Sequence, residues 1–304
     1  IRDRTVSRGL GDVYKRQAVY SSPLKRAAST AAGVLAERND KLSPSFDDGL
    51  LEIDLEPWSG LTADERAERF PEEFATWKRQ PEVLELSRAD GRRYKPLQEL
   101  MQQAREFLDA LISKHPVDGN DTVLIVGHNA ILRCLIVTLL GEPEQGFRRL
   151  RLDNASLSIF NLSSKGDGHQ VQIECLNSTA HLTPPLPTKG KGARLILVRH
   201  GETNWNRDGR FQGQIDIPLN SNGHAQAEAA RGFLADVPIQ KAFSSSMTRP
   251  RETAEGILMS HPDVALQQTD GLVEIGHGLW EGKLESEIKA EWGALLEELS
   301  LIHI

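Results

Sequence analysis

Cysteine, long apolar runs and clustered positive charge are all scarce in this chain of 304 residues. Its two cysteines, Cys134 and Cys175, are too few for a disulfide framework and lack the spacing of a metal site, so we expect a reducing, cytoplasmic setting. The apolar runs at 123–126 and 130–140 are too short or too charged to span a bilayer. A net charge of −7 without a basic stripe argues against nucleic acid as a partner. We therefore expect neither a membrane nor a nucleic-acid partner.

The overall composition of the chain is typical of a globular protein. Hydrophobic residues make up 39% of the chain and charged residues 26%. The length suits one large domain or two ordinary ones. Residues 1–17 and 299–304 resemble translated sequencing-adaptor read-through, so we set them aside as a non-native-looking leader and tail.

One stretch carries a distinctive pattern of charge. The apolar run at 195–198 stops abruptly at Arg199, His200 and Gly201. This pattern predicts a buried strand in an α/β sheet, where ligands sit at the carboxyl ends of strands. A guanidinium beside an imidazole repels a metal cation but suits a phosphate, so we expect no metal and no cofactor. Taken alone, a His and an Arg that merely face solvent explain the pattern equally well.

The chain also contains an internal repeat. The pattern Ser-Ser-x-x-x-Arg, followed by Thr-Ala, occurs at 21–26 and again 223 positions later at 244–249. A Glu-Ile pair at Glu52 recurs 222 positions later at Glu274, and a Trp-x-Gly follows each of them. A two-part match with a slip of one residue indicates a duplicated unit of domain size.

Strand and helix patterns alternate along the chain. We expect strands at 18–20, 121–126, 155–162, 170–176 and 239–243, and helices after the first strand and at 63–78, 97–114, 130–140 and 222–235. Such alternation predicts an α/β fold with a mostly parallel sheet covered by helices on both faces. The proline- and glycine-containing segment 177–193 is expected to be an interdomain linker.

Four motifs together resemble the histidine phosphatase superfamily, also called phosphoglycerate mutase-like. They are Arg199-His200-Gly201-Glu202-Thr203, the duplicated Ser-Ser-x-x-x-Arg, the duplicated Glu-Ile with its Trp-x-Gly, and Gly127-His128. The resemblance covers most of the chain and implies a phosphoglycerate mutase-like fold. The chain looks like a piece of a tandem, two-domain bacterial member. Residues 18–176 would be a first domain without its Arg-His-Gly strand, and 194–298 the N-terminal part of a second.

The resemblance also implies roles for individual residues. His200 would be the nucleophile that becomes a phosphohistidine, and Glu274 or Glu52 would protonate the leaving group and then activate water. Phosphate oxygens would be held by Arg199, by Arg249 or Arg26, and by His128. Asn206, Thr203 and Gly201 would add substrate contacts. Each of these residues alone has a structural reading as well, such as a surface arginine, a surface carboxylate or a core histidine.

The stretch from Glu274 to Gly282 resembles the short, phosphatase-type form of its motif. The sequence therefore favours hydrolysis of a small phosphorylated metabolite by a phosphatase. Phosphoglycerate mutase is the alternative among enzymes, and a phospholigand-binding regulatory module is the non-catalytic alternative. Arg88, Arg92 and Arg93 suggest an anionic substrate tail, although a solvated loop explains them equally well.

Neither copy of the repeat contains every motif, but the two together do. One hypothesis is a composite domain, in which the run at 195–198 docks into the sheet of residues 18–176 and the duplicated segments compete for one position. The rival hypothesis is two separate half-domains with exposed sheet edges.

Overall fold

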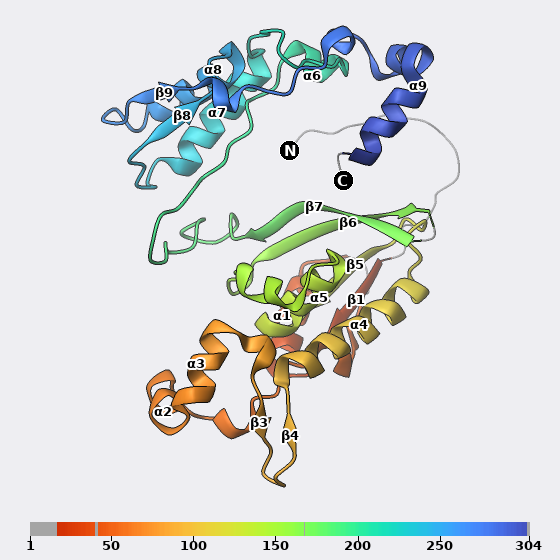
Figure 1. The fold of residues 1–304 in the computed structure, drawn as a ribbon, viewed down its shortest axis with the longest axis vertical. Helices are drawn as coiled ribbons and strands as arrows, with labels where there is room; N and C mark the ends of the chain where they lie inside the picture. Colours follow the sequence, from red (N-terminus) through yellow and green to blue (C-terminus); the bar gives the residue numbers. More distant parts are fainter. Residues whose placement is uncertain (1–16, 40–41, 167, 303–304) are drawn as a thin grey trace. The chain divides into compact units, whose positions relative to one another are not determined.

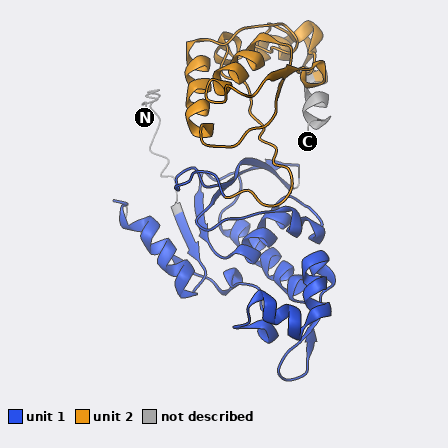
Figure 2. Cartoon of the chain, turned by 90° about the vertical axis from the view of Figure 1, so that its left-hand side faces the viewer, with its two compact units in different colours: residues 1–187 blue, residues 188–304 orange. Residues whose placement is uncertain are grey.

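The computed structural model describes residues 17–39, 42–166 and 168–302 (Figure 1). The chain folds as two compact units, residues 1–187 and 188–304, shown in different colours in Figure 2. The division between them falls within the proline- and glycine-containing segment 177–193. The leader that we set aside lies outside the described residues except for Gln17, and so do residues 303 and 304 of the tail.

A parallel sheet of three strands is the centre of unit 1. Its strands are β1 (Gln17–Ser21), β2 (Ser45–Phe46) and β5 (Thr122–Val126), in the order β2-β1-β5. The main helices are α1 (Lys25–Ala36), α4 (Pro96–Lys114) and α5 (Asn129–Leu139). The strands and helices expected from the sequence here are confirmed, with ends that differ by one or two residues.

Helices cover both faces of this sheet. On one face, Tyr20 of β1 belongs to the main hydrophobic core with residues of α4 and α5, and its ring meets that of Phe107 edge-on at 6.1 Å. Side chains alternate between the faces of a strand, so the neighbouring Val19 points to the other face, where it is also buried. Helix α1, with Ala27 and Ala31 buried, contacts β1 and β5 and covers that second face. The α/β class is therefore confirmed.

The helix expected at 63–78 is divided in two. Helix α2 (Ala63–Arg69) ends at Phe70, and α3 (Pro71–Arg79) begins at the next residue. Phe70 has φ −136° and ψ 56°, outside the helical region. A proline disfavours helical angles in the residue before it and donates no hydrogen bond, so Pro71 ends one helix and starts another. The predicted helical content was right, but its continuity was wrong.

Two antiparallel hairpins complete unit 1. The two strands expected after α5 are confirmed as β6 (Leu157–Lys165) and β7 (Gly168–Ser178). A short hairpin pairs β3 (Leu86–Ser87) with β4 (Arg93–Tyr94). It packs beside α3, with Leu86, Tyr94 and Trp58 in a second hydrophobic cluster.

Unit 2 is built around a parallel pair of strands and two helices. Its elements are α6 (Asn204–Asp208), α7 (Ser221–Leu234), β8 (Ala242–Ser244), α8 (Thr248–Leu258), β9 (Leu266–Gln268) and α9 (Glu285–Ile302). Helix α8 connects β8 to β9 and packs against α7. The expected helix at 222–235 is confirmed, and β8 is shorter than the strand expected at 239–243.

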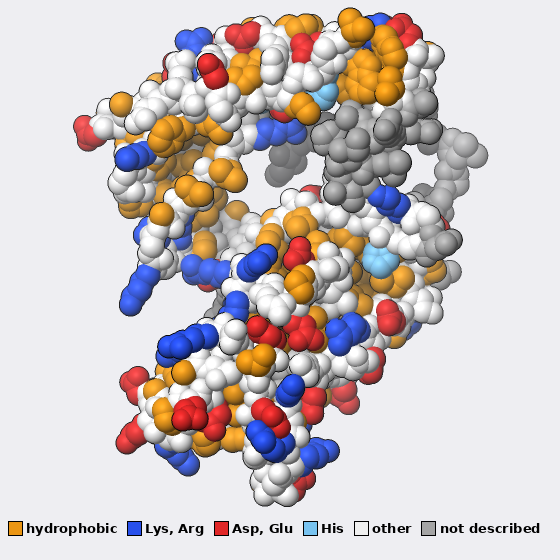
Figure 3. All heavy atoms as spheres, in the orientation of Figure 1, with side chains coloured by type: hydrophobic (Ala, Val, Ile, Leu, Met, Phe, Trp, Pro, Cys, Tyr) orange, Lys and Arg blue, Asp and Glu red, His pale blue; other side chains and the backbone are white. Residues whose placement is uncertain are grey.

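The buried strand expected at 195–198 is absent from the structure. Leu195 and Leu197 are 85% and 92% exposed, and no described strand pairs with this run. A strand is stable only when a neighbouring strand forms hydrogen bonds with its backbone N–H and C=O groups. Without such a strand, the run at 195–198 stays irregular. Hydrophobic side chains reach the surface of unit 2 as a result (Figure 3).

The internal repeat is visible in three dimensions. Strand β1, helix α1 and strand β2 of unit 1 recur as β8, α8 and β9 of unit 2, again as a parallel pair. Local hydrogen bonds recur too: the Ser22 hydroxyl accepts from the Leu24 N–H, and the Ser245 hydroxyl accepts from the Met247 N–H. The two copies therefore share their turn geometry as well as their sequence.

Cys134 is buried, Cys175 is partly exposed, and neither forms a disulfide. Within the part of the chain that the structure describes, no helix is both long enough and apolar enough to cross a membrane.

Candidate active site

In unit 2 the structure places His200 in contact with Arg249. The Nδ1 atom of His200 lies 2.8 Å from the carbonyl oxygen of Gly201, and Nε2 lies 3.2 Å from Nε of Arg249. A carbonyl oxygen can only accept and a guanidinium nitrogen can only donate. The two contacts therefore put the proton on Nδ1 and leave a lone pair on Nε2. This is the neutral tautomer that a nucleophile requires.

The surroundings of His200 favour its neutral form. Burial lowers the pKa of this imidazole, and although its hydrogen bond to the Gly201 carbonyl raises the pKa, the positive charges of Arg249 and Arg199 lower it further. Glu274 has a smaller opposite effect. The net shift is downward, so the ring stays unprotonated at neutral pH.

Arg249 is the most deeply buried charged residue of this site, with 1% of its surface exposed. Its two terminal nitrogens donate to backbone carbonyls, Nη1 to Ile215 at 3.0 Å and Nη2 to Gly213 at 2.7 Å. These bonds use the planar fork of the guanidinium and fix its orientation. The remaining Nε is thereby aimed at the His200 ring.

The loop that supplies those carbonyls is shaped by Glu281. Its carboxylate accepts from the backbone N–H groups of Gln214 at 2.8 Å, His277 at 3.0 Å and Ile215 at 3.1 Å, and these bonds lower its pKa. Gly213 has φ +53°, and a Cβ there would lie 2.1 Å from Oε1 of Glu281. Sequence reasoning missed Glu281. The available signal was a carboxylate inside Trp-x-Gly where the other copy has a serine.

Gly201 allows a close approach to another backbone segment. A Cβ at this position would lie 2.5 Å from the carbonyl oxygen of Gly223, at the start of α7. The Gly201 N–H donates to the hydroxyl of Thr253 on α8 at 3.0 Å, and that hydroxyl donates to the Arg249 carbonyl at 2.8 Å. Thr253 thus joins the His200 segment to the helix that carries Arg249. Its signal in the sequence was the Thr-Ala after each Ser-Ser-x-x-x-Arg.

Thr203 and Asn206 cap helix α6. The Thr203 hydroxyl accepts from the Asn206 N–H at 3.1 Å, and the Asn206 side chain accepts from the Thr203 N–H at 3.1 Å. Thr203 is fully buried, so its hydroxyl is directed into this cap. The structure gives both residues a capping role, and the substrate contacts expected of Thr203, Asn206 and Gly201 stay predictions.

Arg199 and Glu274 are exposed near His200. Each is close enough to His200 to shift its pKa, Arg199 downward and Glu274 upward. Oε1 of Glu274 accepts from the Ile275 N–H at 3.0 Å. Arg199 and His200 also line a hollow of about 230 Å³, together with residues of α7 and Thr253 of α8.

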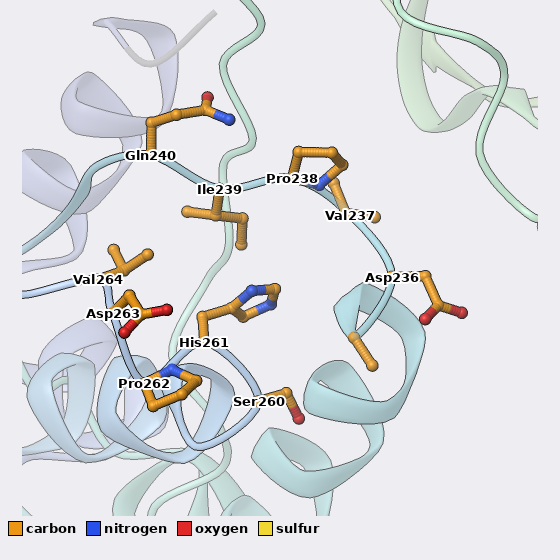
Figure 4. A pocket seen from close by; sticks show the side chains of 11 residues that line it. Asp236, Val237, Pro238, Ile239, Gln240, Ser260, His261, Pro262, Asp263 and Val264 are labelled. Carbon is orange, nitrogen blue, oxygen red and sulfur yellow. The ribbon is translucent and has the colours of Figure 1, made fainter.

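Another hollow of unit 2 lies away from these residues. It has a volume of about 330 Å³ between the loops at 235–240 and 260–264 (Figure 4). His261 projects from one of these loops, and its Nε2 donates to the Leu234 carbonyl at 3.2 Å. That bond ties the loop at 260–264 to the end of α7, and the hollow contains none of the expected site residues.

In unit 1 the structure brings together Arg26 and His128. Nε of Arg26 donates to Nδ1 of His128 at 2.9 Å, and Nε2 of His128 donates to the Ser22 hydroxyl at 2.8 Å. Burial and the Arg26 charge lower the pKa of His128, against a smaller raising effect of Glu52. His128 is buried, whereas Arg26 is exposed.

The carboxylate of Glu52 lies against the first residues of α5, the helix that begins directly after His128. Its Oε1 accepts from the N–H groups of Ile53 at 2.9 Å, Ala130 at 3.1 Å and Ile131 at 3.3 Å. A helix N-terminus offers unpaired N–H groups and a partial positive charge, so it stabilises this carboxylate. Glu52 and Glu274 both accept from the N–H of the following isoleucine, and Glu52 accepts in addition from the first N–H groups of a helix.

The expected site residues are thus divided between the units. Unit 2 holds His200 with Arg199, Arg249 and Glu274, and unit 1 holds a set of three: Arg26, Glu52 and His128. The composite domain stays a prediction. No group of His, Cys, Asp or Glu side chains in the described ranges could hold a metal ion.

Comparison with known proteins identifies the family. A sequence model of the histidine phosphatase superfamily (branch 1) matches residues 4–177 and 195–300. The chain belongs to this superfamily. Its match spans both units, in agreement with a tandem arrangement of two related domains.

Similar proteins include phosphatases from plants and bacteria. The 2-carboxy-D-arabinitol-1-phosphatase of Triticum aestivum is 29% identical over 247 residues, which are 79% of this chain and 47% of the wheat protein. Phosphoserine phosphatase 1 of Hydrogenobacter thermophilus is 31% identical over 164 residues, 54% of this chain and 71% of that protein. Among solved structures, Bacillus stearothermophilus YhfR gives a TM-score of 0.44 at 25% identity, over 54% of this chain and 75% of that one. The chain spans about half the length of its plant relatives.

Proposed function

We propose that this chain forms part of a metal-independent phosphatase that hydrolyses a small phosphomonoester through a phosphohistidine at His200. The observation that carries the proposal is the contact between Nε2 of His200 and Nε of Arg249. It leaves a lone pair on the ring and sets a fixed positive charge beside it. A phosphate dianion repels nucleophiles unless its charge is neutralised, and this arrangement supplies both requirements.

In the first proposed step, the incoming phosphate takes over the N–H of Arg249 Nε, which frees the lone pair on Nε2 of His200. Nε2 then attacks phosphorus and forms the P–N bond while the P–O bond to the leaving group breaks. Arg199 and Arg249 stabilise the negative charge on the non-bridging oxygens. The leaving alkoxide takes a proton from a carboxylic acid, Glu274 or its repeat equivalent Glu52. In the second step the resulting carboxylate takes a proton from water, which attacks phosphorus and releases inorganic phosphate and the neutral imidazole.

Two further observations support this proposal. The wheat and Hydrogenobacter relatives are named for the hydrolysis of small phosphorylated compounds, and a metabolite of that size is the substrate that we propose. The Glu274–Gly282 stretch is short and is held against the Arg249 loop through Glu281. The short form of this stretch, which resembles that of phosphatases, favours hydrolysis over mutase activity. For location we propose the cytoplasm, consistent with two cysteines that are both free.

The test is transfer of a labelled phosphoryl group. We expect the full chain, mixed with a ³²P-labelled phosphomonoester and quenched rapidly, to carry acid-labile and base-stable label at His200. His200→Ala should carry none. His224→Ala is the matched control, because His224 is exposed on α7 and should leave labelling unchanged.

Release of phosphate from p-nitrophenyl phosphate without added bisphosphoglycerate would separate hydrolysis from mutase activity. A chain that binds inorganic phosphate but never becomes labelled would contradict the proposal and identify a phospholigand-binding module instead. Label at another histidine would contradict the assignment of His200.

A further inference from the structure

The hairpin of β6 and β7 leaves one edge of β7 without a partner strand. Within the part of the chain that the structure describes, β7 pairs with β6 and with no other strand (Figure 1). The register shifts of the hairpin fall between Ile173 and Ser178, so residues 168–173 form a regular strand. The second edge of this strand therefore presents a row of backbone N–H and C=O groups that another strand can bind.

This edge lacks most of the features that protect exposed strands. Proline, lysine and clusters of charge commonly prevent an edge strand from pairing with another chain. Residues 168–178 contain no proline, lysine or arginine, and Glu174 is their single carboxylate. Gln170 and Gln172 are exposed, and Ile173 keeps 44% of its surface exposed. The edge is therefore open to a further strand.

The sequence of the edge is complementary to itself. Polar and apolar residues alternate in the segment Gln170-Val171-Gln172-Ile173-Glu174. In an antiparallel pair of two β7 strands with a two-fold axis at Gln172, Val171 of each copy lies opposite Ile173 of the other. Gln170 lies opposite Glu174 in the same way. Side chains that lie opposite each other share one face of a sheet, so apolar residues meet on one face and polar residues on the other.

The single carboxylate of the edge is compatible with this pairing. Glu174 meets Gln170 of the second copy, so the two carboxylates do not oppose each other. Within its own hairpin, Oε2 of Glu174 accepts from Nδ2 of Asn161 at 2.9 Å, which holds the carboxylate on the face that carries Asn161. Gln172 pairs with Asn161 on that face, and Gln170 shares it because side chains two residues apart in a strand point the same way. The amide of Gln170 can therefore donate to that carboxylate.

The pairing would also extend an apolar stripe across the sheet. Phe160 lies opposite Ile173 in the hairpin, and Leu162 lies opposite Val171, so these four side chains share one face. Three of them are partly exposed and Ile173 is exposed. Contacts of Val171 with Ile173 of the second copy join the stripes of the two hairpins and remove apolar surface from water.

We propose that β7 is the interface of a symmetric dimer of this chain, in which two hairpins form one antiparallel sheet of four strands centred on Gln172. A two-stranded hairpin alone is marginally stable, and four strands with a continuous apolar stripe are more stable. The interface is isologous, because the same strand of each copy supplies both halves. The dimer requires nothing of the proposed phosphatase reaction.

Sedimentation equilibrium of the full chain tests the dimer. An interface of one strand pair is small, so we expect a dissociation constant in the micromolar range. Gln172→Lys places two ammonium groups opposite each other on the axis and should raise this constant about twofold to fivefold, and Gln172→Glu should do the same with two carboxylates. An equimolar mixture of the two variants should dimerise at least as tightly as the wild type, because unlike charges then face each other.

Gln170→Lys is the matched control, because it adds the same charge to the same face two residues away. This lysine lies opposite Glu174 of the second copy, so the variant should keep or tighten the dimer. Leu197→Lys is a second control. Leu197 belongs to the other exposed apolar segment, the run at 195–198, and its replacement should leave the dimer unchanged.

An engineered disulfide tests the register. Gln172→Cys should form an intermolecular disulfide under mild oxidation, because opposite residues of antiparallel strands have Cα atoms about 4.5–5.5 Å apart. The natural Cys175 should not form one, because in this register it lies about six residues, or roughly 20 Å, along the strand from the Cys175 of the second copy. Adding Cys175→Ser to Gln172→Cys should leave the disulfide unchanged.

A chain that stays monomeric up to millimolar concentration would overturn the proposal, and so would the absence of a disulfide in Gln172→Cys. Equal weakening by Gln170→Lys and Gln172→Lys would contradict the register. A dimer that Leu197→Lys abolishes and Gln172→Lys retains would assign the association to the run at 195–198 instead. Unchanged far-ultraviolet circular dichroism of each variant separates loss of the interface from loss of the fold. Because dimerisation is measured without a phosphate ligand, failure of the proposed function would leave these results unchanged.

Discussion

Nε of Arg249 donates to Nε2 of His200 at 3.2 Å, whereas Nε of the repeat-equivalent Arg26 donates to Nδ1 of His128 at 2.9 Å. Arg249 and Arg26 thus occupy the same position in the two copies of the repeat but contact different ring nitrogens. The two histidines that they contact come from different motifs. In His200 the lone pair is on Nε2, and in His128 that atom carries the proton and donates to Ser22. In the proposed reaction the first imidazole attacks phosphorus, and the second is expected to donate to a phosphate oxygen.

Replacing Arg249 should slow phosphoryl transfer. Arg249→Lys keeps a positive charge but cannot bond Gly213, Ile215 and His200 at once, because an ammonium lacks the planar fork. We expect labelling of His200 to slow about 100- to 1000-fold, as when one donor to a developing oxyanion is lost. Rapid-quench labelling measures this rate. Arg251, two residues further along α8, is partly exposed and serves as the control. Arg251→Lys should label His200 at nearly the wild-type rate. An equal loss of rate in this variant would show that the effect is not specific to Arg249.

Stability should fall as the pH drops from 7.5 to 5.5. Burial lowers the pKa of His128 and of His200 in the folded chain, so the unfolded chain takes up protons first once the pH falls through about 6.5. Protonation then favours unfolding, and the stability present above that pH is lost. Urea unfolding midpoints should decrease over this range. His128→Gln and His200→Gln should each flatten the decrease, whereas His224→Gln should not, and a steeper decrease in either of the first two variants would refute the assignment.

Alanine substitutions at Gly213 and Gly209 test the packing of the loop that bonds Arg249. Both have positive φ, +53° and +74°, but a Cβ at 209 meets nothing within 4 Å, whereas at 213 it would overlap Glu281. Gly209→Ala should cost only the backbone strain, about 1–2 kcal/mol. Gly213→Ala should cost more and also slow labelling, because the loop must move away from Arg249. Equal midpoints in urea for the two variants would contradict this account of Glu281.

Glu52 should stabilise the start of α5 through its charge. Glu52→Gln keeps the shape of the side chain but weakens its bonds to the Ala130 and Ile131 N–H groups, at a cost of about 0.5–2 kcal/mol. Hydrogen exchange of these two amides should become faster. Glu106→Gln on α4, where the carboxylate accepts a hydrogen bond from the Gln102 side chain, should leave both amides protected as before. Unchanged exchange in Glu52→Gln would show that water already satisfies these groups.

Local pattern predicted most elements of the fold, and the repeat predicted which residues of the two units correspond. Apolar periodicity was sufficient for β1, β5, α4 and α5, since each is stabilised by residues that the sequence shows. The run at 195–198 has the same apolar character as β5 but no described strand to pair with. Strand formation depends on a neighbouring strand, which can come from any part of the chain, so a local pattern cannot guarantee it.

The contacts of the site were harder to predict than its members. His200, Arg249, His128 and Arg26 could be chosen from motifs, but the ring nitrogen that each arginine contacts depends on backbone geometry. Glu281 acts only because three N–H groups converge on it, which no spacing in the sequence reveals.

The exposed run at 195–198 ends immediately before Arg199 and His200. A surface that covers those four apolar side chains would hold the backbone segment that carries both residues. In the proposed reaction, a ligand bound at Arg199 and His200 holds the same segment, so ligand binding and an association that covers the run should strengthen each other.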